Sequence, residues 1–163
     1  MPRVLVAGIG NVFCGDDGFG VEVARRLAGE SLGEDVCVRD FGVAGVHLAY
    51  EMTSGEYDEV ILVDAVPRGG APGTLYAIEP DVTDVPAEAA DAHGLTPVAV
   101  LAWVGRVGGP SPRVTVIGCE PGCLDESMEL SAPVAGAVDA AITMVRERLA
   151  HRPRPEAQAR GLN

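Results

Sequence analysis

Three aspartates, Asp17, Asp40 and Asp64, fall just beyond the C-terminal ends of the first three strands that the sequence predicts. If these strands are parallel neighbours, about 4.8 Å apart, the carboxylates meet at one rim of the sheet, where open α/β folds bind their ligands. A single aspartate at such a place is equally well explained as a helix cap or turn residue. The three together predict acid chemistry at that rim.

His93 could add an imidazole to this rim. One imidazole and two carboxylates form a ligand set suited to a divalent ion such as nickel or zinc. The alternative is that His93 is an ordinary loop or capping residue, and its spacing from the aspartates does not decide between the two.

The turn Gly8-Ile9-Gly10 suggests a second kind of site, one that binds a dinucleotide, with Asp40 placed where a ribose-binding acid is expected. Phe13 stands where the third glycine of that fingerprint belongs, and Asp16-Asp17 would face the pyrophosphate with negative charge. The sequence therefore favours the metal site over the nucleotide site.

The four cysteines form no C-x-x-C pair, which favours core thiols in a reducing compartment over a metal or redox motif. Cys14, in the glycine-rich loop, is the best placed of them to be a nucleophile. Because no cysteine pairs recognisably with a histidine, we expect all four to be dispensable for catalysis: Cys14, Cys37, Cys119 and Cys123.

The elements that position these residues follow from the spacing of apolar side chains. Strands are predicted over 4–8, 36–38 with its end at Asp40, 60–63 with its end at Asp64, 74–78 and 114–117. Helices are predicted after a cap at Asp16 or Asp17, over 44–53, from residue 94, and from Ser131 onward. Short links between alternating strands and helices predict an α/β fold with a parallel sheet.

Two of these helices have predicted apolar faces. That of 44–53 is defined by Val43, Val46 and Tyr50. That of the last helix is formed by Val134, Val138, Ala141, Val145 and Leu149. We expect a single domain over 1–150 and a flexible tail over 151–163.

Composition excludes several functions. A net charge of −12 argues against nucleic acid as a partner, since phosphate binding needs a positive surface. All twelve basic residues are arginine, so a P-loop lysine and a Schiff-base lysine are both excluded. No stretch approaches the roughly 20 apolar residues of a membrane span, and we expect a cytoplasmic protein without a membrane partner.

Several short motifs in order along about 140 residues resemble those of the [NiFe]-hydrogenase maturation endopeptidases. They are Gly8-Ile-Gly-Asn11, Asp16-Asp-Gly-Phe-Gly20, Asp64-Ala65, Pro72-Gly-Thr74, His93-Gly-Leu95, Ile117-Gly-Cys-Glu-Pro121 and Leu130-Ser131. The resemblance implies a three-layer αβα sandwich around a mostly parallel twisted sheet, in agreement with the elements above.

The resemblance also implies a function and a site. Such an enzyme removes the C-terminal extension of a hydrogenase large-subunit precursor into which nickel has been inserted. The residues that match the family's metal-contacting and catalytic positions are Asp17, Asp64 and His93. The expected partner is the nickel-loaded precursor, which presents the nickel itself, and no organic cofactor is expected.

Two segments depart from the family pattern. Phe41-Gly-Val-Ala-Gly45 lacks the second glycine and the threonine that the family has after its aspartate, and Glu126-Ser-Met-Glu129 replaces a lead-in that usually contains glycine. Because the first segment is thought to affect substrate choice, we expect Asp40 to contact the substrate and not the metal. The alternatives are a non-catalytic nickel-sensing docking module that uses the same three residues and, with less support, a nucleotide-binding domain.

Overall fold

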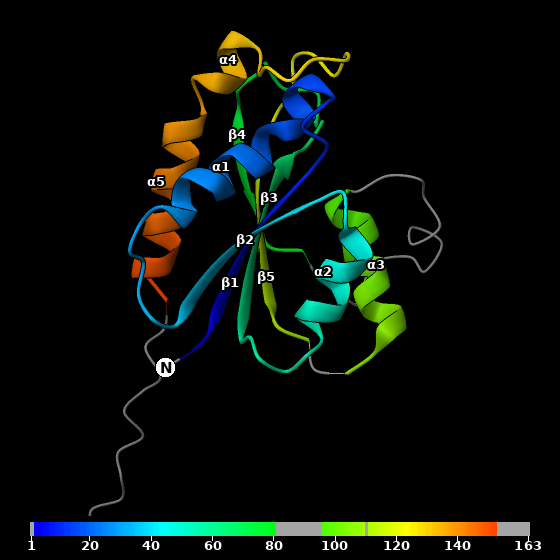
Figure 1. The fold of residues 1–163 in the computed structure, drawn as a ribbon, viewed down its shortest axis with the longest axis vertical. Helices are drawn as coiled ribbons and strands as arrows, with labels where there is room; N and C mark the ends of the chain where they lie inside the picture. The colour runs from blue at the N-terminus through cyan, green and yellow to red at the C-terminus, as the bar shows by residue number, and fades with distance from the viewer. Residues whose placement is uncertain (1, 81–95, 110, 153–163) are drawn as a thin grey trace, which may run out of the picture.

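A five-stranded sheet forms the centre of the computed structural model, which describes residues 2–80, 96–109 and 111–152. The strand order is β2-β1-β3-β5-β4, in which β4 alone is antiparallel, to its neighbour β5 (Figure 1). The predicted parallel α/β fold is therefore confirmed, and the short strand predicted over 74–78 lies at an edge of the sheet. The strands are β1 (Val4–Ile9), β2 (Val36–Gly42), β3 (Glu59–Ala65), β4 (Leu75–Ile78) and β5 (Arg113–Cys119).

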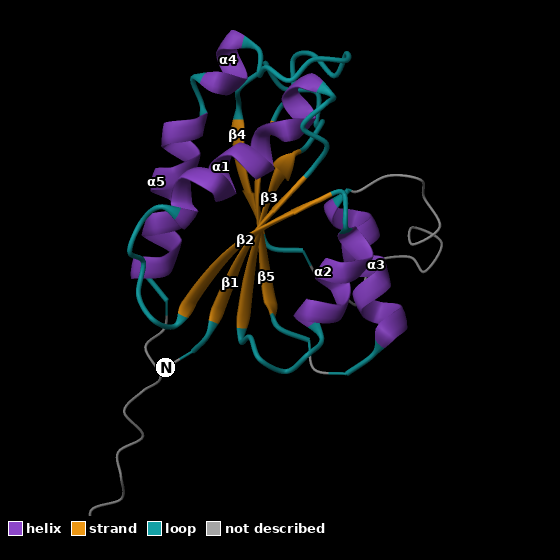
Figure 2. Ribbon diagram, in the orientation of Figure 1, coloured by secondary structure: helices purple, strands orange, loops and turns teal. Residues whose placement is uncertain are grey.

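Helices cover both faces of the sheet, which confirms the three-layer sandwich (Figure 2). One layer contains α1 (Phe19–Ala28), α4 (Ala132–Ala135) and α5 (Val138–Ala150). The other contains α2 (Gly45–Met52) and α3 (Pro97–Val107). A short 3-10 helix, η1 (Gly15–Gly18), joins β1 to α1.

The central strands are apolar without interruption because both of their faces are buried. In β1, Val4 and Val6 pack in the core with α1 and α5, whereas Leu5 and Ala7 pack in the core with α2. The same alternation in β3 assigns Ile61 to the α1 side. Two separate apolar cores therefore hold the central strands in place.

Two glycines let α1 lie directly on the sheet. A Cβ on Gly20 would lie 2.0 Å from the carbonyl oxygen of Val63, and one on Gly8 would lie 2.2 Å from the carbonyl oxygen of Gly20. Real Cβ atoms do not approach backbone oxygens this closely, so both positions require glycine. The contact brings η1, at the start of α1, against the end of β3.

The structure corrects several boundaries. The second strand does not end at Asp40 but continues to Gly42, because a bulge pairs Ile9 with Gly42 and keeps the ladder intact. Neither Asp16 nor Asp17 caps α1, since both lie within η1 and Gly18 is the N-cap.

The apolar face assigned to the second helix is wrong. Val46 and Tyr50 are 43% and 61% exposed, and the buried side of α2 is formed by Leu48, Ala49 and Met52. A helix this short and this apolar offers two possible stripes, and only its contact with α3 and the sheet selects one.

The last helix is divided into α4 and α5, but all five residues of its predicted apolar face are buried. Most of the predicted tail falls in 153–163, outside the described residues. No helix in the described part of the chain is long and apolar enough to cross a membrane.

Candidate active site

Asp64 is the buried acid of the candidate site. It lies near the end of β3 with 1% of its surface exposed, on the side of the strand that carries Leu62, which faces α2 and α3. Its Oδ1 accepts a hydrogen bond of 2.8 Å from the Ala65 N–H. Burial raises the pKa of Asp64 well above its usual range and the charge of Asp17 raises it further, whereas the Ala65 N–H opposes the shift.

Asp17 approaches Asp64 from η1. Its Oδ2 accepts a hydrogen bond of 2.8 Å from the Asn11 N–H, which fixes the half-buried carboxylate over the end of β1. Gly10, with a φ of +133°, lies between the two acids. A Cβ there would lie 1.9 Å from the backbone oxygen of Asp17 and 3.3 Å from Oδ1 of Asp64. The structure therefore brings Asp17 and Asp64 together, as the sequence predicts.

Asp40 does not join this pair, so the expectation that three acids converge is corrected. It follows Val36 and Val38 at alternate positions of β2, and these valines pack on the α1 side of the sheet. Its Oδ2 lies 3.5 Å from Nε of Arg25 on α1, and its Oδ1 accepts a hydrogen bond from the Gly42 N–H. Asp40 and Asp64 thus share a rim but lie on opposite faces, because side chains alternate along a strand.

His93 lies outside the described residues, so the predicted ligand set of Asp17, Asp64 and His93 stays a prediction. Across 2–80, 96–109 and 111–152, no three side chains of His, Cys, Asp or Glu are arranged to hold a metal ion. Two carboxylates alone leave most of the coordination sphere of a nickel or zinc ion to other ligands.

Asp16 is a buried acid whose role the sequence analysis missed. Its carboxylate accepts hydrogen bonds of 2.7–2.8 Å from the N–H groups of Gly122, Cys123 and Ser131 and from the Ser131 hydroxyl. Burial by itself raises the pKa of Asp16, but the hydrogen bonds from Cys123, Ser131 and Gly122 outweigh it and leave the pKa below its ordinary value.

Glu120 is a second buried acid that was missed. It is 3% exposed and directly follows β5, and its carboxylate accepts hydrogen bonds from the N–H groups of Arg68 and Gly70. The rule that selected Asp64, an acid immediately after a buried strand, would also have selected Glu120.

The cysteines differ from one another in burial. Cys119 is fully buried, and burial, with the charges of Asp16 and Glu120, raises the pKa of its thiol to about 11. Such a thiol is a poor nucleophile, in agreement with a packing role. Cys14 and Cys37 are half-buried and Cys123 is exposed, so of the four cysteines only Cys119 is the expected core thiol.

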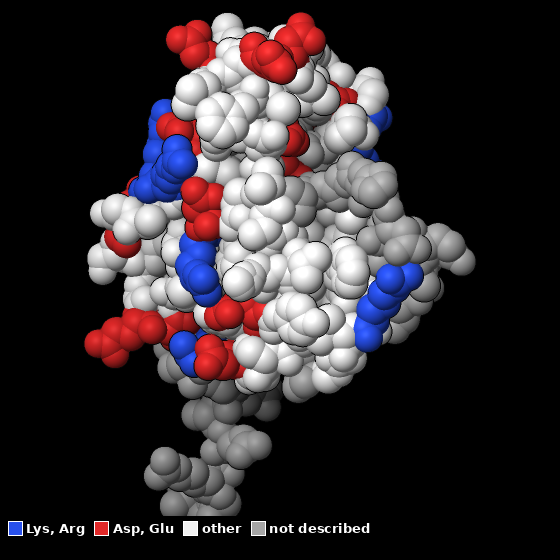
Figure 3. Space-filling view, turned by 45° about the vertical axis from the view of Figure 1, so that its right-hand side comes forward, with Lys and Arg blue, Asp and Glu red and all other residues white. Residues whose placement is uncertain are grey.

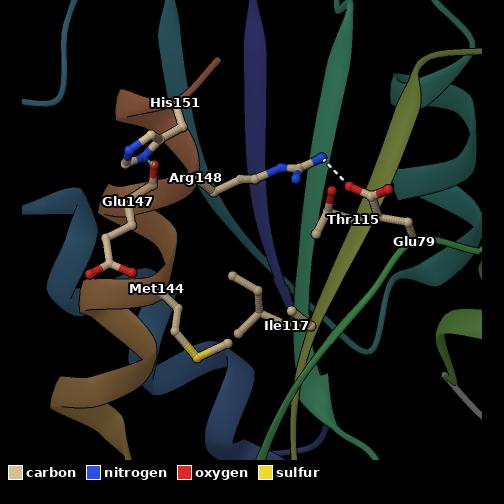
Figure 4. A pocket seen from close by; sticks show the side chains of 8 residues that line it. Glu79, Thr115, Ile117, Met144, Glu147, Arg148 and His151 are labelled. Carbon is tan, nitrogen blue, oxygen red and sulfur yellow. Dashed lines mark hydrogen bonds and ion pairs between the residues drawn. The ribbon is translucent and has the colours of Figure 1, made fainter. Parts of the chain in front are cut away.

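A cavity of about 630 Å³ lies between β4, β5 and α5, and none of the predicted site residues lines it (Figure 4). Thr115 lines it, three residues along β5 from Gly118, which is the sheet partner of Asp64. Arg148 crosses it and pairs with Glu79 at 2.7 Å and with the buried Glu59 at 3.1 Å. These ion pairs join α5 to β3 and to the end of β4.

Comparison with known proteins assigns the chain to a family. The HycI family model, hydrogenase maturation protease, matches residues 21–148. This chain belongs to the hydrogenase maturation protease family. It is similar to the hydrogenase expression/formation protein HupD of Rhizobium leguminosarum bv. viciae, with 36% identity over 152 residues that cover 89% of this chain and 73% of HupD. A putative hydrogenase maturation protease of Methanocaldococcus jannaschii is 33% identical over 146 residues, covering 87% and 93% of the two chains.

Solved structures of hydrogenase maturation proteases have the same fold. The hydrogenase 2 maturation peptidase of a Thaumarchaeota archaeon superimposes with a TM-score of 0.71 at 37% identity, over 91% of this chain and 98% of the other. For the maturation protease HycI of Thermococcus kodakarensis the TM-score is 0.73 at 29% identity, over 91% and 93%.

Membership in the hydrogenase maturation protease family makes this chain an endopeptidase, a hydrolase. The nucleotide-binding alternative also loses its geometric basis. The space beside Gly10, where a pyrophosphate would have to approach, is filled by the backbone oxygen of Asp17.

Proposed function

We propose that this protease removes the C-terminal extension of a [NiFe]-hydrogenase large-subunit precursor after nickel has been inserted into it. The observation that carries the proposal is the placement of the buried Asp64 beside the half-buried Asp17 at the rim of the sheet, in a chain of the maturation protease family. Nickel belongs to the substrate here, because the precursor presents it.

Nickel recognition follows from an incomplete ligand set. Two carboxylates and the imidazole of His93 bind an isolated ion only modestly, but they can complete the coordination of an ion already held by the precursor's thiolates. A precursor without nickel then lacks the contact that aligns its scissile bond. The metal ion thereby becomes the feature by which the enzyme recognises a mature active site.

Cleavage requires a polarised carbonyl and a water that loses a proton. The substrate's nickel supplies the positive charge that polarises the carbonyl or acidifies the water, and a carboxylate accepts the proton. Asp64 suits this proton transfer because burial raises its pKa above that of an ordinary aspartate, which makes its carboxylate the stronger base. The cytoplasmic location of this protease stays a prediction.

Asp40 suits a role in substrate choice. Its side chain is exposed at the same rim, on the α1 side, and its partners are Arg25 and the N–H group of Gly42. It is therefore accessible to a large substrate without belonging to the Asp17–Asp64 pair.

The surface around the rim suits a polypeptide substrate. Figure 3 shows a face on which charged side chains gather mainly along one side and at the top, with a broad uncharged area between them. Phe13, Val43 and Met128 are each more than half exposed, on loops close to η1 or to the end of β2. They give a polypeptide substrate apolar side chains to pack against at this end of the molecule.

A precursor-processing gel tests the proposal. Purified protease is mixed with its nickel-loaded or nickel-free precursor, and shortening is expected for the nickel-loaded form alone. Asp64→Asn and His93→Ala should abolish cleavage, whereas Asp139→Asn, an exposed control on α5, should cleave normally. Binding of the loaded precursor without shortening would instead identify a docking module.

The same gel separates specificity from chemistry. Asp40→Asn should keep the nickel requirement but cleave cognate and non-cognate precursors in altered proportion. If Asp40→Asn loses all cleavage, as expected for His93→Ala, then Asp40 belongs with the metal residues and its assignment to substrate choice is wrong.

A further inference from the structure

We propose that Glu120 is a positioning residue of the protease, which acts with Asp16 to hold the loop after Asp64 and the turn that carries Asp17 in one fixed arrangement. The proposal rests on the proposed function, because it assumes that Asp17 and Asp64 act on the precursor. Neither Glu120 nor Asp16 touches the substrate in this account.

Glu120 fixes the loop that follows Asp64. The Arg68 N–H donates to the two carboxylate oxygens of Glu120 at 3.0 and 2.9 Å, and the Gly70 N–H donates to Oε1 at 2.5 Å. The Tyr76 hydroxyl lies 3.4 Å from the same oxygen. A Cβ on Gly70 would meet that hydroxyl at 2.3 Å, so the Tyr76 side chain can lie beside Glu120 without shifting because residue 70 is glycine.

The backbone of Glu120 strengthens this attachment. Its N–H donates to the carbonyl of Thr74 at 2.8 Å, and its carbonyl accepts from the N–H of Gly73 at 2.9 Å. Val66, two residues after Asp64, donates to the carbonyl of Cys119. The segment from 66 to 74 is therefore held by 119–120 at several points.

Asp16 holds the second half of the rim, the turn that carries Asp17, whereas Glu120 holds the first half, the loop after Asp64. Asp16 does so through the residues next to Glu120. It accepts from the N–H groups of Gly122 and Cys123, and its own N–H donates to the carbonyl of Cys123 at 2.9 Å. Because Asp17 is the next residue in η1, this contact fixes its backbone. The loop held by Glu120 and the groups held by Asp16 come close together at Gly122. A Cβ on Gly122 would lie 3.1 Å from Pro72 and 3.3 Å from the Ser131 hydroxyl.

The five residues from 119 to 123 thus connect Asp64 to Asp17 through two buried carboxylates. This arrangement has a mechanistic consequence, because a displacement of about 1 Å between groups that act together can lower a rate about 100-fold. Backbone N–H groups locked onto a buried acceptor resist such a displacement more than a solvated loop does.

Glu120→Gln tests the proposal with minimal change in volume. The NH₂ group of the glutamine side chain replaces one acceptor oxygen and therefore faces an N–H donor of the loop, with which it cannot form a hydrogen bond. We expect kcat for precursor cleavage to fall about 10- to 100-fold, while KM changes by less than about threefold, since substrate contacts are intact. Glu56→Gln, an exposed acid at the opposite end of β3, is the matched control and should leave both constants unchanged.

Amide hydrogen exchange provides a readout that needs no substrate. Glu120→Gln should speed exchange at Arg68 and Gly70 and also at Gly122 and Cys123, because the two halves form one unit. Asp16→Asn should produce the reciprocal change. The effects of the two substitutions on kcat should be far from additive, as expected for residues that hold one structure.

The outcomes are distinct. An unchanged kcat in Glu120→Gln, or faster exchange confined to Arg68 and Gly70, would overturn the proposal. If Glu120→Gln is too unstable to assay, Tyr76→Phe, which removes only the hydroxyl contact, should give a smaller fall in kcat without a change in KM. If the native protease cleaves no precursor, the proposed function fails, and the exchange measurement alone decides whether the two halves are coupled.

Discussion

Replacing Asp16 by asparagine should destabilise the protein at neutral pH. The carboxylate accepts four hydrogen bonds and is fully buried. Asparagine keeps one acceptor oxygen, so its NH₂ group must face at least one N–H donor, and the remaining bonds lose their charge assistance. A hydrogen bond to a charged acceptor contributes about 1.5–3 kcal/mol and a neutral one about 0.5–1.5 kcal/mol.

The expected loss in the free energy of unfolding is about 2–4 kcal/mol. This is less than the sum of the contributions of the four hydrogen bonds, because Gly122 and Cys123 are exposed and their N–H groups can bind water instead. For a chain of this size the loss corresponds to a Tm lower by about 5–15 °C. Urea denaturation followed by circular dichroism measures it. Asp139→Asn, whose side chain is 90% exposed, should stay within about 0.5 kcal/mol of the native protein.

The effect should also depend on pH in a defined direction. Because the pKa of Asp16 is lowered in the folded state, its contribution is fully present above the unfolded-state pKa of about 3.9 and is lost as pH falls through the folded-state pKa. The difference between the native protein and Asp16→Asn should therefore shrink under acidic conditions. A difference under 0.5 kcal/mol at pH 7, or one that acid leaves unchanged, would refute this account.

Three further substitutions test other parts of the structure. Asp64→Asn should gain stability relative to the native protein as pH rises above about 4 in urea titrations, because burial raises the pKa of Asp64 and ionising it costs free energy; a constant difference would contradict this. Gly20→Ala should abolish folding, judged by circular dichroism, since its Cβ would meet the Val63 carbonyl, whereas Gly105→Ala in α3 has open space and should stabilise by about 0.5–1 kcal/mol. Thr115→Val should raise the Tm, because its buried hydroxyl has no hydrogen-bond partner among the residues that the structure describes; a lower Tm would show that the hydroxyl is satisfied by water.

The order of strands and helices and the placement of Asp64 could be predicted from sequence because they depend on local patterns. An uninterrupted apolar strand must be buried on both faces, and the residue that ends it lies at the rim of a parallel sheet. The approach of Asp17 to Asp64 was likewise predictable, since both acids follow strands whose ends a parallel sheet brings to the same rim.

The exposed face of α2 and the separation of Asp40 were not predictable in this way. Both depend on phase: Val46 and Tyr50 have helical spacing but face solvent, and Asp40 shares its face with Val38 and not with Asp64. The sequence pattern gives the spacing at which apolar side chains recur along a helix or strand. The neighbouring elements decide which face of that helix or strand is buried.

The sequence by itself determined the α/β fold, the two acids of the candidate site and the family resemblance, because each of these is read from short local patterns along the chain. Only the tertiary structure decided that Asp16 and Glu120 are buried acceptors, since the groups that donate hydrogen bonds to them lie about 50 to 115 residues away in the chain. A buried carboxylate is stable only where the whole fold brings enough N–H groups to it.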